Sequence, residues 1–146
     1  MSEPNSSRWL EVLSTAECHE YLQQEGLGRV GVSIGALPVI LPVLYRAEDN
    51  AIWFFTEEGT KLDTAVSNTV VAFEVDHLDL EGGWSVLVIG QSREETDPVR
   101  VAAMREAGLV AGAPGCRDHL ISIPIGHISG RRFVNDSQLK VTPGYN

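Results

Sequence analysis

The feature that most limits the fold of this chain is a succession of apolar strands with very short connections. Residues 28–34, 38–46 and 51–56 have strand patterns, and only a few residues separate each from the next. Parallel neighbours need a crossover of about a dozen residues or more, whereas antiparallel neighbours need only a turn. The sequence therefore predicts a mainly β protein, with an antiparallel sheet closed into a small barrel.

Three further segments have strand patterns, at residues 69–77, 84–96 and 119–133. Residues 38–46 and 84–90 are apolar on both faces, so a one-domain barrel leaves one of their faces without a partner. Packing against another subunit is the simplest way to bury such a face. Pro42 has no N–H for a sheet ladder, which predicts that its strand is interrupted there or lies at a sheet edge.

Three short helices are predicted between the strands, at residues 14–25, 60–68 and 97–108. The first opens with the spacing of a capping box, in which Ser14 is followed three residues later by Glu17. Gly26 can end this helix in the left-handed conformation. The third helix begins with Asp97 as N-cap and Pro98 at the first helical position.

The charge balance narrows the classes of function. Eleven basic against twenty acidic side chains give a net charge of -9 over 146 residues. A general binder of nucleic acid or acidic membranes neutralises phosphates with Lys and Arg, so neither partner is predicted. A small anionic ligand needs only one local positive pocket. Cys18 and Cys116 fit no metal spacing and are interpreted as reduced thiols.

No segment has the pattern of a targeting or membrane-spanning element. The N-terminus lacks a basic stretch followed by an apolar one, so no signal peptide is predicted. No apolar run approaches the roughly 20 residues that a helix needs to cross a bilayer. We therefore expect a soluble cytoplasmic protein with no membrane partner.

Residues 54–66, FFTEEGTKLDTAV, hold the only lysine among the first 139 residues. A helix that starts at Thr60 presents free backbone N–H groups, which suit an anion. Thr56 and Thr60 can add hydroxyl donors, and Lys61 adds a full positive charge. The alternative is a surface lysine beside Asp63 or Glu57, and spacing alone favours neither reading.

Trp84 and Ser85 open an otherwise aliphatic strand directly after Gly82-Gly83. One interpretation is a rim tryptophan that covers the end of the barrel. The other is a flat aromatic wall and a hydroxyl that face a planar ligand, as in cofactor sites with apolar walls and few polar groups. The four histidines are scattered without metal-ligand spacing, so no metal site is predicted and no catalytic residue can be assigned.

Four stretches, in this order and with these gaps, resemble the pyridoxamine 5′-phosphate oxidase-like family, the FMN-binding split barrels. They are LGRVGVSIGALPVILPVLY, IWFFTEEGTKLDTAVSNTVVAFEVD, GGWSVLVIGQSREETD and HLISIPIGHISGRRF. The chain is most similar to the branch that includes the nitroimidazole-resistance proteins. The resemblance implies a six-stranded antiparallel split β-barrel over residues 13–134, flanked by a flexible segment at 1–12 and a tail at 135–146.

The resemblance also implies a function and a site. Family members are homodimers that hold FMN at the subunit interface, so we expect a homodimeric oxidoreductase that passes electrons or hydride through FMN to a small-molecule substrate. By position, Leu41, Pro42 and Val43 would contact the flavin ring. Phe55 and Thr56 match an aromatic-Thr pair near the ring and phosphate. Lys61, preceded by Thr60, matches the residue that holds the phosphate, and Ser85, next to Trp84, stands at a flavin-contacting glutamine.

Two departures leave alternatives open. The true oxidases have an arginine where this chain has Thr60, and their C-terminal substrate-binding arginine and histidine pattern is not found, so oxidation of vitamin B6 is not predicted. The same fold could bind a deazaflavin, or a haem with His77 or His127 as axial ligand. A non-catalytic flavin- or ligand-binding module is the other alternative. Arg131-Arg132 is interpreted as a surface pair at a strand end rather than a ligand contact.

Overall fold

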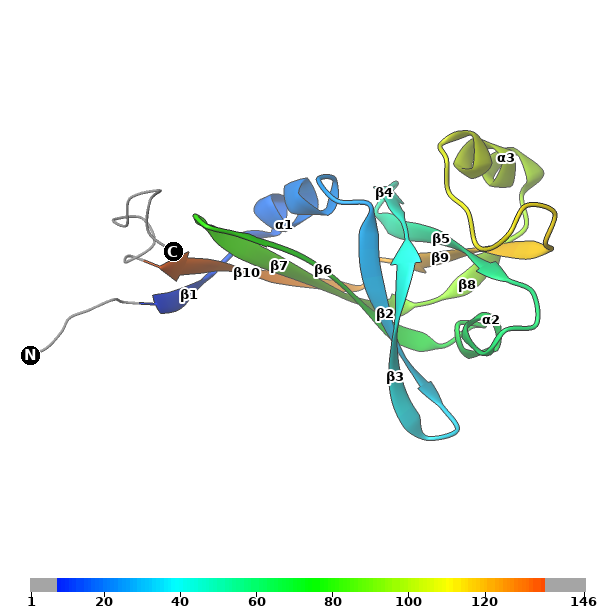
Figure 1. The fold of residues 1–146 in the computed structure, drawn as a ribbon, viewed down its shortest axis with the longest axis horizontal. Helices are drawn as coiled ribbons and strands as arrows, with labels where there is room; N and C mark the ends of the chain where they lie inside the picture. The colour runs from blue at the N-terminus through cyan, green and yellow to red at the C-terminus, as the bar shows by residue number, and fades with distance from the viewer. Residues whose placement is uncertain (1–7, 136–146) are drawn as a thin grey trace, which may run out of the picture.

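The computed structural model describes residues 8–135, which form ten strands in two antiparallel sheets and three helices (Figure 1). The larger sheet has the order β1 (Arg8–Val12), β10 (His127–Asn135), β7 (Gly82–Gln91), β6 (Val70–Asp79), β2 (Leu27–Ile34) and β3 (Leu37–Leu44). The smaller sheet has the order β4 (Arg46–Glu48), β5 (Ala51–Glu57), β9 (Asp118–Pro124) and β8 (Arg93–Glu95). The helices are α1 (Thr15–Leu22), α2 (Lys61–Ala65) and α3 (Pro98–Glu106). The predicted mainly β, antiparallel split-barrel class is confirmed.

Three strands predicted as continuous are each divided between the two sheets, and these divisions together with β1 account for ten strands where six were predicted. The segment 38–46 breaks at Tyr45, so Arg46 belongs to β4. The segment 84–96 breaks at Ser92, whose buried hydroxyl donates to the Val66 carbonyl at 2.6 Å. The segment 119–133 breaks at residues 125–126, where Gly126 N–H donates to the Ile89 carbonyl at 3.1 Å. At Ser92 the chain passes from the larger sheet to the smaller one, and at residues 125–126 it returns to the larger sheet.

The N-terminal region differs from the prediction in two ways. Residues 8–12 pair with β10 as strand β1, so the flexible segment predicted over 1–12 extends too far; residues 1–7 lie outside the described part. Helix α1 opens with the predicted capping box, since Ser14 and Glu17 satisfy each other's backbone N–H groups. It ends at Leu22 in a right-handed Gln23 cap, and Gly26 is not left-handed, so the predicted stop was wrong.

The core lies between the sheets and under α1. Phe54, Phe73 and Val88 are fully buried at its centre, and Cys18 and Leu22 bring α1 onto it. Burial alternates along β2, the first part of β6 and all of β7, because successive side chains of a strand point to opposite faces of the sheet. Among residues 8–135, no helix is long and apolar enough to span a bilayer.

Strand β3 runs through Pro42 without a break and lies at the edge of the larger sheet. Of the two predicted outcomes for Pro42, the edge position is therefore the one observed. An edge strand tolerates proline because one side of it needs no ladder N–H. This edge also forms one wall of the candidate site.

Candidate functional site

A cleft of about 550 Å³ opens where the edge strand β3 meets the turn between β5 and α2. A third wall comes from the loop that follows α3. The cleft is lined by Leu27, Leu41, Pro42, Val43, Leu44, Phe55, Thr56, Glu57, Thr60, Lys61, Leu62, Val110, Ala111 and Gly112. Its walls are mostly aliphatic, with a few polar groups at the β5–α2 turn, which is the usual make-up of a small-molecule site.

The β5–α2 turn owes its shape to a few residues. Strand β5 is buried from Ala51 to Thr56, so the chain reaches the surface abruptly at Glu57. Gly59 takes the left-handed conformation with φ 84°, which favours a residue without a Cβ. Thr60 then caps α2 and leaves Lys61 as the first helical residue, exposed beside the cleft.

Seven of the nine residues predicted to contact a cofactor line this one cleft. They are Leu41, Pro42, Val43, Phe55, Thr56, Thr60 and Lys61. The structure thus brings together segments that lie apart in the sequence, although contact with a cofactor stays a prediction. Phe55 exposes little of its ring to the cleft, because it is buried under α3 and the Arg105 guanidinium lies 4.7 Å from its ring centre.

Trp84 and Ser85 do not line the cleft of their own chain. Trp84 is 5% exposed and stacks on Tyr21 of α1 with ring centroids 4.5 Å apart, so it serves as part of the core and not as an open wall for a ligand. Ser85 lies on the opposite face of β7, in register with Asp76 and Arg131. Because side chains alternate along a strand, these two neighbours cannot face the same ligand.

The two threonines at the turn are not the free donors that the sequence suggested. The Thr56 hydroxyl donates to Asp63 Oδ1 at 2.7 Å, and the Thr60 hydroxyl donates to the Glu57 carbonyl at 2.8 Å. A hydroxyl has one proton to give, so neither has a proton left for a phosphate oxygen. Thr60 Oγ1 in turn accepts from the backbone N–H of Asp63 at 3.2 Å as an N-cap.

Lys61 has no ion pair with any residue between 8 and 135 in the structure. The alternative of a lysine held by Asp63 is not observed, because Asp63 is occupied by other donors. Glu57 lines the same cleft and is exposed. The ammonium is therefore available to an anion, although the second charge at the cleft is negative.

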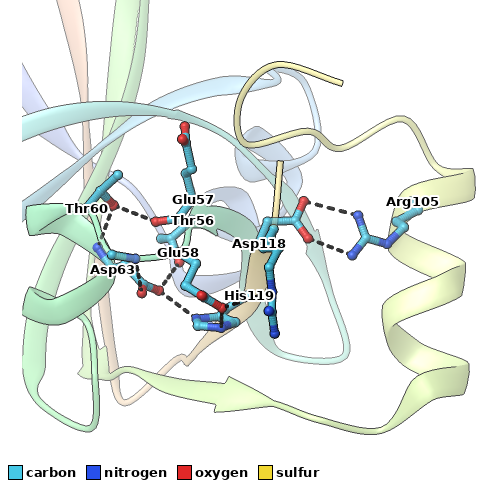
Figure 2. A network of polar contacts seen from close by, with 10 residues as sticks. Thr56, Glu57, Glu58, Thr60, Asp63, Arg105, Asp118 and His119 are labelled. Atoms are coloured by element: carbon cyan, nitrogen blue, oxygen red, sulfur yellow. Dashed lines mark hydrogen bonds and ion pairs between the residues drawn. The ribbon is translucent and has the colours of Figure 1, made fainter. Parts of the chain in front are cut away.

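A network of polar contacts holds the β5–α2 turn, next to the residues that line the cleft (Figure 2). Asp63 accepts from Thr56, from the Gly59 N–H at 3.1 Å and from His119 Nδ1 at 2.9 Å. Burial raises the pKa of Asp63, but the hydrogen bonds from these three donors outweigh it and lower the pKa overall. The other His119 nitrogen, Nε2, lies 3.3 Å from Glu58 Oε1. The hydrogen bond to Asp63 raises the pKa of His119 against the opposing effect of burial.

Sequence reasoning missed two parts of this site. The loop residues Val110, Ala111 and Gly112 have no motif that points to the cleft, and only the fold places them there. His119 was counted among the scattered histidines. It lies opposite Thr56 in the β5–β9 pairing, a relation visible only once the register of the two strands is known.

The remaining candidate residues lie elsewhere. His77 pairs with Glu25 at 3.3 Å and Asp79 at 3.2 Å, and neither it nor His127 lines the cleft, so neither could hold a haem there from its own chain. Within the described part of the chain, no cluster of His, Cys, Asp and Glu has the make-up of a metal site.

The Arg131-Arg132 pair divides between the two faces of β10. Arg132 reaches Glu17 at 3.1 Å and Glu11 at 3.3 Å, so it joins β10 to α1 and β1. Arg131 is exposed on the other face. Neither lines the cleft of its own chain.

Sequence comparison relates most of the chain to known proteins. The profile of a protein family described as Pyridoxamine 5′-phosphate oxidase matches residues 14–132. An uncharacterised protein of Mycobacterium tuberculosis is 32% identical over 144 residues, which cover 94% of each chain.

Solved structures give the same relation in three dimensions. An FAD-binding protein from Mycobacterium smegmatis is 34% identical with a TM-score of 0.76, covering 85% of this chain and 98% of the other. A candidate pyridoxamine 5′-phosphate oxidase from Corynebacterium glutamicum is 27% identical with a TM-score of 0.72, covering 92% and 97%. A candidate 5-nitroimidazole resistance protein from Bacteroides thetaiotaomicron, at 14% identity and TM-score 0.70 over 92% and 96%, shares the fold.

Proposed function

The chain belongs to the pyridoxamine 5′-phosphate oxidase family, and from this premise we propose that it binds a flavin nucleotide in the cleft beside Lys61. The observation that carries the proposal is the convergence of Lys61, the β3 edge and the Phe55-Thr56 pair on one cleft. A volume of about 550 Å³ lies within the usual range for small-molecule and cofactor sites.

The residues present fit such a ligand at both of its ends. The aliphatic side chains of β3 offer an apolar wall to a planar ring, and the outward edge of the strand offers backbone polar groups. Lys61, free of internal ion pairs within residues 8–135, offers a positive charge to a phosphate. Since both threonine protons are committed elsewhere, Lys61 is the main side-chain donor at the phosphate end.

We propose FMN as the ligand, on the position of Lys61, and an oxidoreductase activity toward a small molecule. A bound flavin supplies the electron or hydride transfer, whereas the chain binds the nucleotide, orients its ring and leaves one side open to a substrate. FAD is a second candidate, because the 34% identical protein from Mycobacterium smegmatis binds FAD. In addition, FMN ends in a phosphate of nearly two negative charges, and Lys61 alone offers that phosphate few contacts.

We further propose that the site is completed by a second copy of the chain. Residues that face each other in antiparallel pairs share a face, which places Leu27, Ile40, Leu44 and Leu87 on the outer face of the larger sheet. All four are exposed, Ile40 by 72%. Leu27 and Leu44 also line the cleft, so a copy packed on this face would border the ligand, and its Ser85 would lie on the surface it presents.

Flavin binding is tested by titrating the purified protein with FMN and with riboflavin, which lacks the phosphate, and following flavin fluorescence. We expect FMN to bind more tightly than riboflavin. Lys61→Ala should weaken FMN about 10- to 100-fold, since a hydrogen bond to a charged group contributes about 1.5–3 kcal/mol. Its affinity for riboflavin should stay unchanged.

Arg93→Ala is the matched control, because it removes one exposed positive charge that does not line the cleft. Equal FMN affinity in Lys61→Ala and wild type would refute the phosphate site, and absence of flavin binding by the wild type would refute the function. Chromatography of flavin released by heat distinguishes FMN from FAD. Sedimentation at several concentrations tests for a species of twice the 15.9 kDa chain mass.

A further inference from the structure

The wall that carries Lys61 is rich in carboxylates. Glu57 lines the cleft, and Glu58 and Asp63 flank Lys61 within the same turn. Three negative charges beside one lysine form a poor environment for an anion, since charges a few ångströms apart interact appreciably even near a protein surface. Something in the fold must offset them if this wall is to hold a phosphate.

His119 is placed to do so. Its Nδ1 lies 2.9 Å from Asp63 Oδ1 and its Nε2 lies 3.3 Å from Glu58 Oε1. An imidazole with a carboxylate close to each of its nitrogens is favoured in its protonated form, because both negative charges stabilise the cation. His119 is 30% exposed and Asp63 13% exposed, so the pair is partly shielded from solvent. The charged ring therefore neutralises one carboxylate and bridges a second.

The same contacts determine the shape of the turn. Asp63 accepts from Thr56 of β5 and from Gly59 of the turn, while His119 attaches it to β9. Lys61 lies between Gly59 and Asp63 in the sequence, inside the loop that these contacts close. The backbone position of Lys61 therefore depends on the Asp63 carboxylate, which His119 holds; Figure 2 shows the contact between Asp63 and His119.

We propose that Asp63 and His119 are positioning residues for the phosphate that Lys61 holds, and that the protonated His119 makes this acidic wall receptive to an anion. The inference rests on the proposed flavin site and adds to it a dependence on proton concentration. Neither residue lines the cleft. Together they fix the backbone of the β5–α2 turn and determine the charge near Lys61.

The charged groups around His119 are Asp63 of α2, Glu58 of the turn and Glu94 of β8. Arg117, just before β9, lies 3.5 Å from Glu58 and is 84% exposed, so it shares that carboxylate from the solvent side. His119 therefore has three carboxylates near it and only one positive charge, which is exposed to solvent. This surplus of negative charge favours the protonated form of His119. As the pH rises through the elevated pKa of His119, the wall loses this cation and should hold a phosphate less well.

The test is the ratio of FMN to riboflavin affinity, measured from pH 5.5 to 8.5 in wild type, His119→Asn and Asp63→Asn. Asparagine at position 119 can place an amide N–H about where Nδ1 stood, so it retains the bond to Asp63 without the charge. The second pKa of a phosphate lies near 6, so FMN itself becomes more anionic with rising pH in every variant. The ionisation of the FMN phosphate affects both proteins equally, so it cancels when the affinity ratio of wild type is divided by that of His119→Asn.

At low pH we expect the wild-type ratio to exceed that of His119→Asn by about five- to tenfold, the effect of one partly screened charge on a dianion. The two ratios should converge at high pH. Asp63→Asn should lower the ratio at all pH values, and a melting curve checks that each variant is folded.

Each alternative outcome is distinct. Parallel ratio profiles in wild type and His119→Asn would overturn the inference, as would equal losses of FMN and riboflavin, which indicate a merely structural role. A wild type that binds neither flavin would refute the proposed function, and the inference with it. A loss confined to Lys61→Ala would support the function and overturn the positioning role.

Discussion

Gly90 lies where the two sheets touch, and replacing it by alanine should destabilise the protein. A Cβ at this position would stand 2.1 Å from the carbonyl oxygen of Pro124 and 2.9 Å from Cγ2 of Ile123. Ordinary contacts of a Cβ begin at 3.4 Å. The oxygen belongs to the backbone at the end of β9, so neither strand can yield by a side-chain rotation.

The expected loss of unfolding free energy follows from this overlap. Overpacking of a core typically costs about 1–3 kcal/mol, and a clash with a backbone carbonyl, which no rotamer change relieves, belongs at the upper end. The lower entropy of an unfolded chain with alanine returns about 0.4–1 kcal/mol. We expect a net loss of about 2 kcal/mol, which for a chain of this size lowers the melting temperature by about 4–8 °C.

Gly26→Ala is the matched control for this measurement. No atom lies within 4 Å of a Cβ built on Gly26, and its backbone is not left-handed. The same substitution should therefore be neutral or stabilise by up to about 1 kcal/mol. Both variants are compared by urea denaturation followed by circular dichroism, at one protein concentration. A Gly90→Ala midpoint equal to that of wild type would refute the claimed close approach of the sheets.

Two further predictions concern buried polar groups. Tyr45→Phe removes a hydroxyl that donates to the Leu22 carbonyl at 2.7 Å, so the unfolding free energy should fall by about 1–2 kcal/mol, and an unchanged melting curve would contradict this. Burial and Asp76 raise the pKa of Glu74 to about 7, against the effect of Arg29. Glu74 then contributes fully to the free energy of unfolding below about pH 4.5, and this contribution is lost as the pH rises through about 7. The urea midpoint of the wild type should therefore fall between pH 5 and pH 8 by more than that of Glu74→Gln. An equal fall in both proteins would contradict the raised pKa of Glu74.

Much of the fold was accessible from local patterns, and the misses share one cause. The strand patterns of β2, β6 and β7 and the capping residues of α1 and α3 predicted elements close to those observed. The breaks at Ser92 and at residues 125–126 were missed, because each lies inside a segment whose strand pattern continues on both sides. Whether such a segment stays in one sheet depends on contacts such as Ser92 with Val66, which no local pattern contains.

The candidate site divides in the same way. Charge and spacing singled out Lys61 and the residues next to it, because the relevant groups are neighbours in the chain, and the family resemblance decided between a surface lysine and a phosphate ligand. His119 and the loop at 110–112 were not, since they approach the turn only through the pairing of β5 with β9 and the return of the chain after α3. The roles of Thr56 and Thr60 were misjudged because a hydroxyl in a sequence does not reveal which acceptor will take its proton.

The walls of the cleft come from β3 in one sheet, from the end of β5 in the other, and from the loop at 110–112. A chain with only one sheet formed therefore has no such cleft, and a ligand that fits it binds the completed native state alone. By mass action such a ligand at 100 times its dissociation constant adds about 2.7 kcal/mol to the free energy of unfolding. The concentration of such a ligand would then help to determine what fraction of the protein is folded at equilibrium.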